Sequence, residues 1–566
     1  MQFIVKNLLW LLLLGFPAAV LAQSSTLPQD NKHQVLLDRL DIKLQRFENL
    51  NVLTAKPISR KAAVLLGEYA DSIHKAGSLS LSAVDKSNLR SLFMNNSEWV
   101  SGDKADFNSR KPLWNTFYKT KANFIEVNQK DFFLALNPVL QQQLSFESGN
   151  TERVFLNTKG VAFRGMIAKK IGFSAYLTDN QERAPRFGKQ RVDSFNAVPG
   201  VGFYKRFKTT ATDYFDGRGS VFFNATKYLE MQFGYDKNFI GNGYRSLFLS
   251  DFGNSYLFFK INTRIWKLNY MNLFIELTPQ TIQINAGDKL LDKKYAALHH
   301  LSINVTPWLN LGLFEAVVFG RKNHFEFSYL NPIMFLRVAE QQNGSADNAL
   351  VGFDFKANVA KRAQLYGQLL LDEFFLKEVR AGNGWWANKF GLQLGGKYID
   401  LFNIKNLDIQ GEVNLVRPFT YSHFDSVSNY THYNQPLAHP LGANFAEFIG
   451  IIRYQPLPKW SGSLRIIYWK QGLDSTGTAA NYGSDIFKLN SSRSAGDYGY
   501  TIGSGIANKG INARLLISYE WKENLFLEGS GLYRKVSKPV GANYPPDASV
   551  FTVGLRWNMF RREYDY

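Results

Sequence analysis

The feature that most constrains this chain is a one-for-one alternation of apolar and polar residues, which recurs from about residue 131 to the end. In Leu407–Leu415 every second residue is Leu, Ile, Gly or Val, and the residues between them are Asp, Gln, Glu and Asn. Phe551–Met559 repeats the pattern. Successive side chains of a strand point to opposite faces, so each stretch predicts a β-strand with one apolar and one polar face.

Aromatic residues are unusually frequent in the same region, and the 566 residues of the chain include 46 Phe, 27 Tyr and 11 Trp. No segment after the N-terminus approaches the ~18–20 consecutive apolar residues of a membrane helix. An outer-membrane barrel uses both features, because its strands turn aromatic and apolar side chains to lipid and polar ones to a wet lumen, and its closure leaves no unpaired edge. We therefore predict an all-β fold, a transmembrane antiparallel β-barrel of roughly 14–18 strands formed by residues 121–566.

The connections between the predicted strands alternate between short and long, as in barrels with short periplasmic turns and long outer loops. The short connections are residues 306–308, 402–405, 455–459 and 521–524. The long ones fall near residues 178–220, 320–350, 417–445 and 471–510. The final aromatic residue, Tyr566, follows an alternating strand and fits a terminal strand recognised by the outer-membrane assembly machinery, although Arg561–Glu563 form a charged tail.

The first 22 residues predict a cleaved secretory signal peptide. Lys6 precedes the apolar run Leu8–Leu14, and Val20–Ala22 provides a small-residue cleavage site. The sequence contains no Cys, which excludes disulfides, thiolate metal sites and the lipoprotein route of cleavage. Export together with a barrel pattern predicts localisation in the cell outer membrane.

Residues 23–120 lack the long alternation and predict a small helical region in the periplasm, at the mouth of the barrel. Arg60–Ile73 is rich in Ala, Leu and Lys, and Ser82 followed by Asp85 resembles a capping box at the start of a second helix. Earlier, Leu40–Leu44 alternates with charged residues and predicts a short strand.

The central stretch, residues 222–277, combines a strand, a polar loop and a hairpin. In the loop, here called the central loop (residues 236–251), Gly241 and Gly243 are predicted to adopt backbone conformations closed to other residues and to let a ligand come close. The candidate ligand-binding residues of this loop, whose groups suit sugar hydroxyls or carboxylates, are Asp236, Lys237, Asn242, Arg245 and Asp251. The alternative, which we favour for Arg245, is an internal network in which it braces Asp236 or Asp251.

Phe233–Asp251, followed by Phe259–Thr263, resembles the Wzi-like capsule-assembly family of outer-membrane barrels, and most closely the gliding-motility RemB-type members of the Bacteroidetes. Supporting stretches occur in order at residues 328–332, 371–374, 416–423 and 438–445. The resemblance implies an outer-membrane barrel closed at its periplasmic end by an N-terminal helical bundle. It also implies a part in attaching or assembling surface polysaccharide, or in the gliding machinery that moves adhesins over the cell surface.

Seven basic residues against two acidic ones gather between residues 181 and 210, in a predicted outer loop. A concentrated positive field attracts anionic polymers and lipopolysaccharide phosphates, so Arg183, Arg186 and Arg191 are candidate ligands for an anionic surface polysaccharide. The alternative is a merely solvated face. The expected partners are outer-membrane lipid and lipopolysaccharide, an anionic surface polysaccharide, and gliding-machinery or adhesin proteins. Secretion and the lack of a basic groove with stacking aromatics argue against nucleic acid.

The sequence offers no convincing catalytic or metal-binding motif. Asp372 and Glu373 are strand neighbours that should face opposite sides, and Glu315 cannot be placed beside them from sequence alone. The histidines of the predicted loop 417–445 have no compact zinc-ligand spacing. We therefore predict a non-enzymatic barrel without catalytic residues, metal or cofactor. Two alternatives remain: a porin or substrate-specific channel, which would conduct, and an outer-membrane lipase or protease, which would need a catalytic constellation at its outer rim.

Overall fold

The computed structural model describes residues 24–28, 31–45, 53–280, 290–333, 335–475, 479–537, 540 and 546–566. The predicted signal peptide, residues 1–22, lies outside these ranges.

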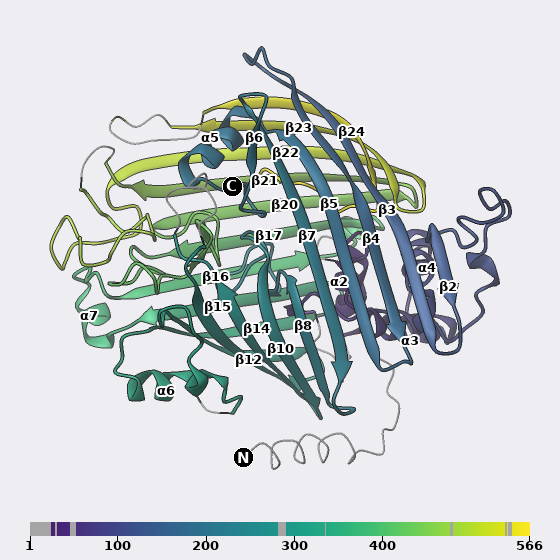
Figure 1. Cartoon of the computed structure of the whole chain (residues 1–566), viewed down its shortest axis with the longest axis horizontal. Helices are drawn as coiled ribbons and strands as arrows, with labels where there is room; N and C mark the ends of the chain where they lie inside the picture. Colours follow the sequence, from purple (N-terminus) through teal and green to yellow (C-terminus); the bar gives the residue numbers. More distant parts are fainter. Residues whose placement is uncertain are drawn as a thin grey trace.

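Within the described residues, eighteen antiparallel strands form one closed barrel (Figure 1). They are β3 (Phe132–Glu147), β4 (Val154–Ile167), β5 (Ile171–Arg183), β7 (Ala211–Asn224), β8 (Leu229–Asp236), β10 (Tyr256–Ile265), β11 (Leu268–Leu277), β12 (Lys294–Thr306), β13 (Leu309–Phe319), β14 (Asn348–Val359), β15 (Ala363–Glu373), β16 (Lys389–Tyr398), β17 (Leu407–Val416), β20 (Phe445–Leu457), β21 (Trp460–Leu473), β22 (Ile506–Lys522), β23 (Leu525–Val536) and β24 (Ala548–Trp557). The seam pairs β24 with β3, from Val550 opposite Glu147 to Trp557 opposite Leu140. The predicted fold class is confirmed, at the upper end of the predicted strand number.

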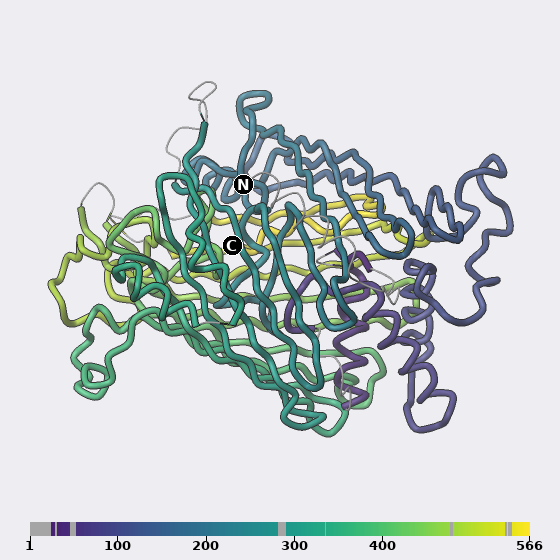
Figure 2. Tube along the Cα trace, turned by 60° about the horizontal axis from the view of Figure 1, so that its bottom comes forward, coloured from purple at the N-terminus to yellow at the C-terminus, as the bar shows by residue number. Residues whose placement is uncertain are grey.

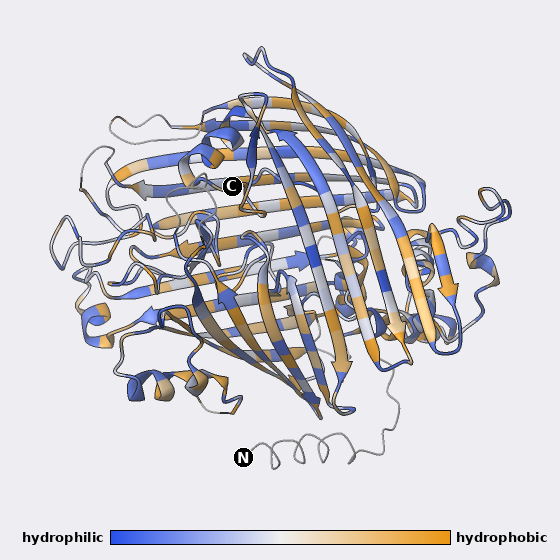
Figure 3. Cartoon of the chain, in the orientation of Figure 1, coloured by the Kyte–Doolittle hydropathy of each residue, from blue (hydrophilic) through white to orange (hydrophobic). Residues whose placement is uncertain are grey.

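The alternation in the sequence appears as alternating colour along the strands in Figure 3. In β8 the side chains of Phe233 and Tyr235 are exposed on the outer face, whereas Gln232 and Gly234, on the inner face, are buried. In β17 the lumen-facing residues are buried as well, namely Asp408, Gln410, Glu412 and Asn414. The polar face of the sheet therefore meets a lumen filled with protein, not the wet lumen that the sequence predicts, because the N-terminal region, the long loops and the C-terminus all enter the barrel.

Short and long connections lie at opposite ends, here called the short-turn end and the long-loop end. Turns at the short-turn end include residues 266–267, 307–308, 399–406, 458–459 and 523–524, in agreement with the predicted short connections. Connections at the long-loop end include residues 184–210, 237–255, 320–347, 417–444 and 474–505. The first of these is shorter than predicted, because β5 and β7 extend into it.

Short helices and strands lie in the connections and beside the barrel. Those of the long-loop end are α5 (Arg186–Phe195), β6 (Lys205–Phe207), β9 (Phe239–Ile240), η3 (Phe327–Leu330), α6 (Leu336–Gln342), α7 (Leu376–Ala381), β18 (Thr431–His432) and β19 (Gln435–Pro436). At the short-turn end, η4 (Leu401–Asn403) follows β16, and β2 (Ile125–Asn128) pairs only with β3. None of the helices in the described ranges is long and apolar enough to cross a membrane.

A helical plug (residues 31–45 and 53–99) lies at the short-turn end, drawn in purple in Figures 1 and 2. It contains α2 (Gln34–Leu44), α3 (Arg60–Lys75), α4 (Ala83–Asn95) and η1 (Ser97–Trp99), and η2 (Ala105–Phe107) follows it. The helices share a core that includes Leu37, Leu40, Ala63 and Leu92. The predicted capping box is present, because Ser82 Oγ accepts from the Asp85 N–H and the Asp85 carboxylate accepts from the Ser82 N–H.

The short strand predicted at residues 40–44 is wrong, since these residues belong to α2. Leu36, Leu37, Leu40 and Leu44 follow helical spacing and pack on the other two helices. The charged residues between them are buried too, because they point to the barrel wall instead of to water. A helix buried on two sides by partners of different polarity imitates the alternation of a strand.

Ion pairs fasten the plug to the lumen wall. Arg39 lies 2.9 Å from Asp400, and Asp41 lies 3.0 Å from Lys356. Farther round the ring, Lys32 lies 2.6 Å from Glu520. Polar residues of the inner face are thus used to dock the plug. Whether residues 23–120 form a separate unit stays a prediction.

The last nine residues, the C-terminal tail (558–566), leave β24 at the short-turn end and run through the lumen toward the long-loop end. Four of them form ion pairs inside the barrel. Three pair with the wall, namely Arg561 with Glu528, Arg562 with Glu182, and Glu563 with Arg465 and Arg514, whereas Asp565 pairs with Arg245 of the central loop. Tyr566 packs against Phe187 of α5. The prediction that Tyr566 ends a terminal strand is therefore wrong: the strand ends at Trp557, and the charged residues after it serve the lumen.

Candidate functional site

The central loop folds into the lumen, where it meets the helical plug. A two-residue strand of the plug region, β1 (Ala55–Lys56), pairs with β9, with Ala55 opposite Ile240. The Gly241 N–H donates to the Thr54 carbonyl at 2.8 Å, and the Thr54 hydroxyl lies 3.0 Å from Asn242 Oδ1. Asn242, a predicted ligand-binding residue, is thereby occupied by a contact within the protein.

Arg245 is buried and braces the structure, but not through the predicted partners. Its Nη1 lies 3.0 Å from the Asp565 carboxylate of the C-terminal tail, and its Nη2 lies 3.5 Å from Glu447 of β20. In the described chain neither Asp236 nor Asp251 forms an ion pair with it. The sequence could not supply these partners, because Asp565 is 320 residues away in a tail whose entry into the lumen has no sequence signal.

Of the other charged residues of the loop, Lys237 makes a contact within the loop and Asp236 faces a cavity. Lys237 is buried, donates from Nζ to the Asp251 carbonyl at 3.0 Å and thereby joins the two ends of the loop. Burial, together with the nearby Arg218 guanidinium, lowers the pKa of the Lys237 ammonium to about 7. Asp236, at the end of β8, borders an internal cavity. Its one hydrogen bond among the described residues comes from the N–H of Lys237, at 2.8 Å.

The two glycines are both structural, for different reasons. Gly241 has φ +154°, a backbone conformation that side-chain-bearing residues rarely adopt. Gly243 has an ordinary φ, but a Cβ there would lie 2.5 Å from Glu412 Oε2. The predicted special backbone conformation is therefore present at Gly241 only, and close packing is what requires glycine at Gly243.

Glu412 holds the loop in place and was not identified from the sequence. Its carboxylate accepts the N–H of Tyr244 at 2.6 Å, the N–H of Arg245 at 3.0 Å and the hydroxyl of Tyr366 at 2.9 Å. In the sequence it is one more polar residue on the inner face of β17. The signal that could have found it is an acid placed between two amides, Gln410 and Asn414, on that face.

The three arginines predicted to bind polysaccharide all make contacts within the protein. Arg183 Nε lies 3.0 Å from the Thr210 hydroxyl, and Arg186 Nε lies 3.4 Å from Glu147. Arg191 donates to the Pro440 carbonyl at 3.0 Å and lies over the rings of Phe252 and Tyr566. Arg186 and Arg191 thereby hold α5 on the barrel, while the Arg186 side chain stays 44% exposed.

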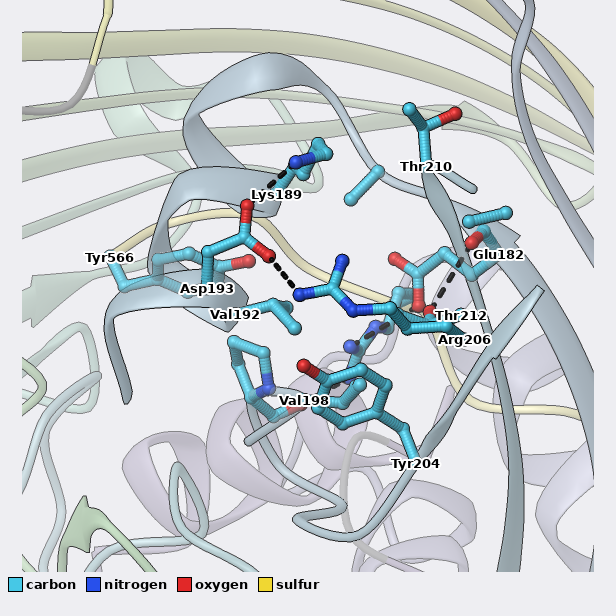
Figure 4. A pocket seen from close by; sticks show the side chains of 14 residues that line it. Glu182, Lys189, Val192, Asp193, Val198, Tyr204, Arg206, Thr210, Thr212 and Tyr566 are labelled. Carbon is cyan, nitrogen blue, oxygen red and sulfur yellow. Dashed lines mark hydrogen bonds and ion pairs between the residues drawn. The ribbon is translucent and has the colours of Figure 1, made fainter. Parts of the chain in front are cut away.

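Other cations of the same loop face outward. Figure 4 shows Lys189 and Arg206 directed at Asp193, with Nζ 2.6 Å and Nη2 3.3 Å from its carboxylate. The cavity beside them has a volume of about 20 Å³, enough for a single water molecule and too small for a sugar ring. Beyond it, the hairpin of residues 203–208 carries the exposed residues Phe203, Lys205, Arg206 and Lys208.

The acidic residues considered for catalysis contact basic or imidazole side chains of neighbouring strands. A register shift in β15 next to Glu373 lets both Asp372 and Glu373 reach Lys389, at 3.3 and 2.9 Å, although they are neighbours in a strand. Glu315 lies on another strand and contacts His299 at 2.8 Å. The two side chains at residues 372 and 373 therefore share a cation, not a proton.

The histidines of the 417–444 loop are separate from one another. His432 Nδ1 accepts the Thr278 N–H, and its Nε2 donates to the Ser255 carbonyl. His439 lies 2.7 Å from Glu447, while His423 Nδ1 accepts the N–H of Asp425. Burial lowers the pKa of His423 and of His432 to about 4. Among the described residues, no three His, Cys, Asp or Glu side chains form a group able to hold a metal ion.

No protein-family model matches the sequence, and no curated protein is significantly similar to it. Among solved structures, the chain is similar to Wzi of Escherichia coli, described as an outer membrane protein involved in group 1 capsule assembly and as a carbohydrate binding β-barrel. The TM-score is 0.55 at 14% identity, over 95% of this chain and 99% of Wzi.

Two further structures are less similar. OprD of Pseudomonas aeruginosa has a TM-score of 0.41 at 11% identity, over 75% of this chain and 94% of OprD. OccAB2 of Acinetobacter baumannii has a TM-score of 0.42 at 9% identity, over 75% of this chain and 97% of OccAB2. What the comparisons establish is the fold, which this chain shares with the outer-membrane barrel Wzi.

Proposed function

We propose that this protein is a non-enzymatic, non-conducting outer-membrane barrel that acts in gliding motility or in the attachment and assembly of surface polysaccharide and adhesins. The observation that carries the proposal is the occupied lumen. The helical plug enters from the short-turn end, the central loop and the loop 417–444 fill the long-loop end, and the C-terminal tail runs between them. A barrel so filled is suited to present its outer loops rather than to pass solutes.

The surface of the barrel supports a membrane location. Exposed tryptophans lie at four of the short turns or the strands beside them, namely Trp266, Trp308, Trp460 and Trp521. Such residues prefer the boundary between lipid and water, so they support an interface at this end. Short turns face the periplasm in such barrels, which makes the short-turn end the periplasmic one. The long loops then reach the cell exterior, where outer-membrane lipid and lipopolysaccharide are the first partners.

For an anionic polysaccharide we assign the hairpin 203–208 as a contact, and the role of the three arginines selected from sequence stays a prediction. Its basic side chains are exposed beside an exposed phenylalanine, which offers a flat apolar surface to a sugar ring. The similarity to Wzi, a carbohydrate binding barrel, and the sequence resemblance to the Wzi-like family support a saccharide as the ligand.

This assignment is tested by the double variant Lys205→Glu and Lys208→Glu. We expect weaker binding of purified acidic surface polysaccharide, with a difference from wild type that grows as salt is lowered, because exposed charges are screened within about 10 Å at 0.1 M salt. The matched control is Lys205→Gln with Lys208→Gln, which removes charge without reversing it and should have a smaller effect. Equal binding by all three proteins across the salt series would remove the hairpin from the proposal.

The cellular role is tested by a clean deletion scored for both spreading on agar and capsule staining. We expect loss of spreading if the protein serves adhesin movement, and loss of retained capsule if it anchors polysaccharide. Normal spreading together with normal capsule would contradict both. Stepwise conductance of the purified protein in planar bilayers would favour the porin alternative instead.

A further inference from the structure

A second and larger cavity lies in the lumen, between the helical plug, the inner wall from β3 to β8 and the C-terminal tail. Its volume is about 180 Å³. At ~10–15 Å³ for each water position, it holds roughly a dozen waters or a small molecule with about as many non-hydrogen atoms. Four polar side chains that border it have unused hydrogen-bonding groups: Arg60, Tyr176, Arg218 and Asp236.

Arg60 is the first residue of α3, and its side chain is buried. Nε donates to the Thr26 carbonyl at 3.0 Å and Nη1 to Asn96 Oδ1 at 2.7 Å, while Nη2 has no hydrogen-bond partner in the described chain. No carboxylate of the described residues forms an ion pair with this guanidinium. Burial, and next the nearby Arg164, lower the pKa of Arg60 to about 9. Glu98 offsets part of this effect but is itself paired with Arg164 at 3.0 Å. A buried cation without an ion pair of its own is costly, and an anion in the cavity would relieve that cost.

The opposite wall offers a complementary pair. Arg218 spends Nε and Nη2 on Asp216, at 3.0 and 2.7 Å, which leaves Nη1 without a hydrogen bond among the described residues. Its guanidinium lies 4.5 Å from the centre of the Phe560 ring. Asp236 accepts a single backbone N–H and has no ion pair in the described ranges. The buried hydroxyl of Tyr176, which borders the same space, also lacks a partner there.

We propose that this luminal cavity binds one hexuronate unit, an acidic sugar, with its carboxylate on Arg60 and its hydroxyls on Asp236 and Arg218. A simple anion would satisfy Arg60 but would be repelled by the Asp236 carboxylate. A neutral sugar would satisfy Asp236 but leave the Arg60 charge unpaired. A hexuronate carries both an anionic group and hydroxyl donors, has about a dozen non-hydrogen atoms and presents an apolar ring face to Phe560. Buried polar groups rarely remain without partners, so the four unused groups favour a polar occupant.

The inference extends the proposed role in surface polysaccharide, but its site is separate from the outer hairpin. Its test uses purified full-length protein in detergent and a monosaccharide, D-glucuronate, measured by titration calorimetry. We expect saturable binding of glucuronate and at least tenfold weaker binding of glucose, which lacks the carboxylate. Arg60→Gln should weaken glucuronate binding by about 10–100-fold, the effect of losing a charge-assisted hydrogen bond.

Asp236→Asn separates a sugar site from a bare anion site and also serves if Arg60→Gln does not fold. It should weaken glucuronate binding and leave the binding of inorganic phosphate equal or tighter, since it removes a repelling charge. Arg380→Gln, an exposed cation of α7 outside both proposed sites, is the matched control and should bind glucuronate as wild type does. No glucuronate binding by wild type, or unchanged binding by Arg60→Gln, would overturn the site. Phosphate binding as tight as that of glucuronate would overturn the sugar assignment. Both failures leave the outer hairpin and the cell-surface role untouched.

Discussion

The pair formed by Arg245 and Asp565 offers a direct test of whether the C-terminal tail holds the central loop. Both side chains are buried, their charged atoms lie 3.0 Å apart, and Arg245 Nη2 also donates to the Asp565 carbonyl. We consider Arg245→Ala, Asp565→Ala and the double variant, because a double-mutant cycle isolates the energy that belongs to the pair.

The magnitude follows from what each single change leaves behind. Removing one partner of a buried pair costs about 3–5 kcal/mol, since the remaining charge stays buried and unpaired. Here the cost should fall at the low end. Asp565 keeps Tyr244 and the nearby Arg465, and Arg245 keeps Glu447 at 3.5 Å. We therefore expect about 3 kcal/mol for each single variant and a coupling energy of about 2 kcal/mol, so that the double variant costs about 4 kcal/mol rather than 6.

The assay is urea unfolding of purified protein in detergent, followed by tryptophan fluorescence and by the heat-dependent migration of the barrel on gels. The matched control is the pair of Arg206 with Asp193, at 3.3 Å on the exposed outer loop. Exposed pairs couple by about 0.2–1 kcal/mol, so that cycle should be nearly additive. The bracing argument is refuted if the Arg245 and Asp565 effects also add within about 0.5 kcal/mol, or if Arg245→Ala unfolds like wild type while losing polysaccharide binding.

Three further predictions concern the loop and the plug. Gly243→Ala should lower the free energy of unfolding in urea by about 1–3 kcal/mol, because its Cβ would press on Glu412. Gly411→Ala, with open space around it, should lower it little. Equal losses for the two variants would contradict the packing account. Burial alone would raise the pKa of Glu523, but Lys32 and Ser91 lower it to about 2. The ionised Glu523 carboxylate therefore contributes about 3 kcal/mol to the free energy of unfolding above pH 4.5, and this contribution is lost as pH falls toward 2. Acid should thus expose the plug of purified barrel to an acid-active protease, and Glu523→Gln should expose it already at pH 7; a plug equally protected at pH 3 and 7 would count against this. External protease on intact cells should leave residues 31–99 uncut, and their removal from an otherwise whole barrel would reverse the proposed orientation.

The strands were largely predictable because their signal is local. Alternation placed β17 within one residue and β24 within three. Lipid on one side of the sheet and polar groups on the other impose a period of two, whatever fills the lumen. The same pattern misled at residues 40–44, where two different buried surfaces made a helix look like a strand. The capping box at Ser82 was predictable for the opposite reason: it depends only on two residues three positions apart.

The candidate site was less predictable because its contacts join distant parts of the chain. The crowded residues of the central loop marked the right place, but the partners of Arg245 come from a strand 202 residues later and from the tail. The basic loop was identified by its charge, yet charge alone does not reveal that Arg186 pairs with Glu147 or that Arg191 lies over aromatic rings. Likewise, the unpaired Arg60 looks in the sequence like any other basic residue at the start of a helix.

The course of the C-terminal tail has a consequence for assembly and for the handling of the protein. Because β24 closes the ring on β3, the tail must already be inside, or be drawn in from the periplasm, when the seam forms. Whatever is joined to residue 566 therefore starts within the lumen, between α5 and β23, where the Tyr566 carbonyl accepts from Arg534. A purification tag or reporter fused there would compete with the tail for this space, so tags belong in the outer loops.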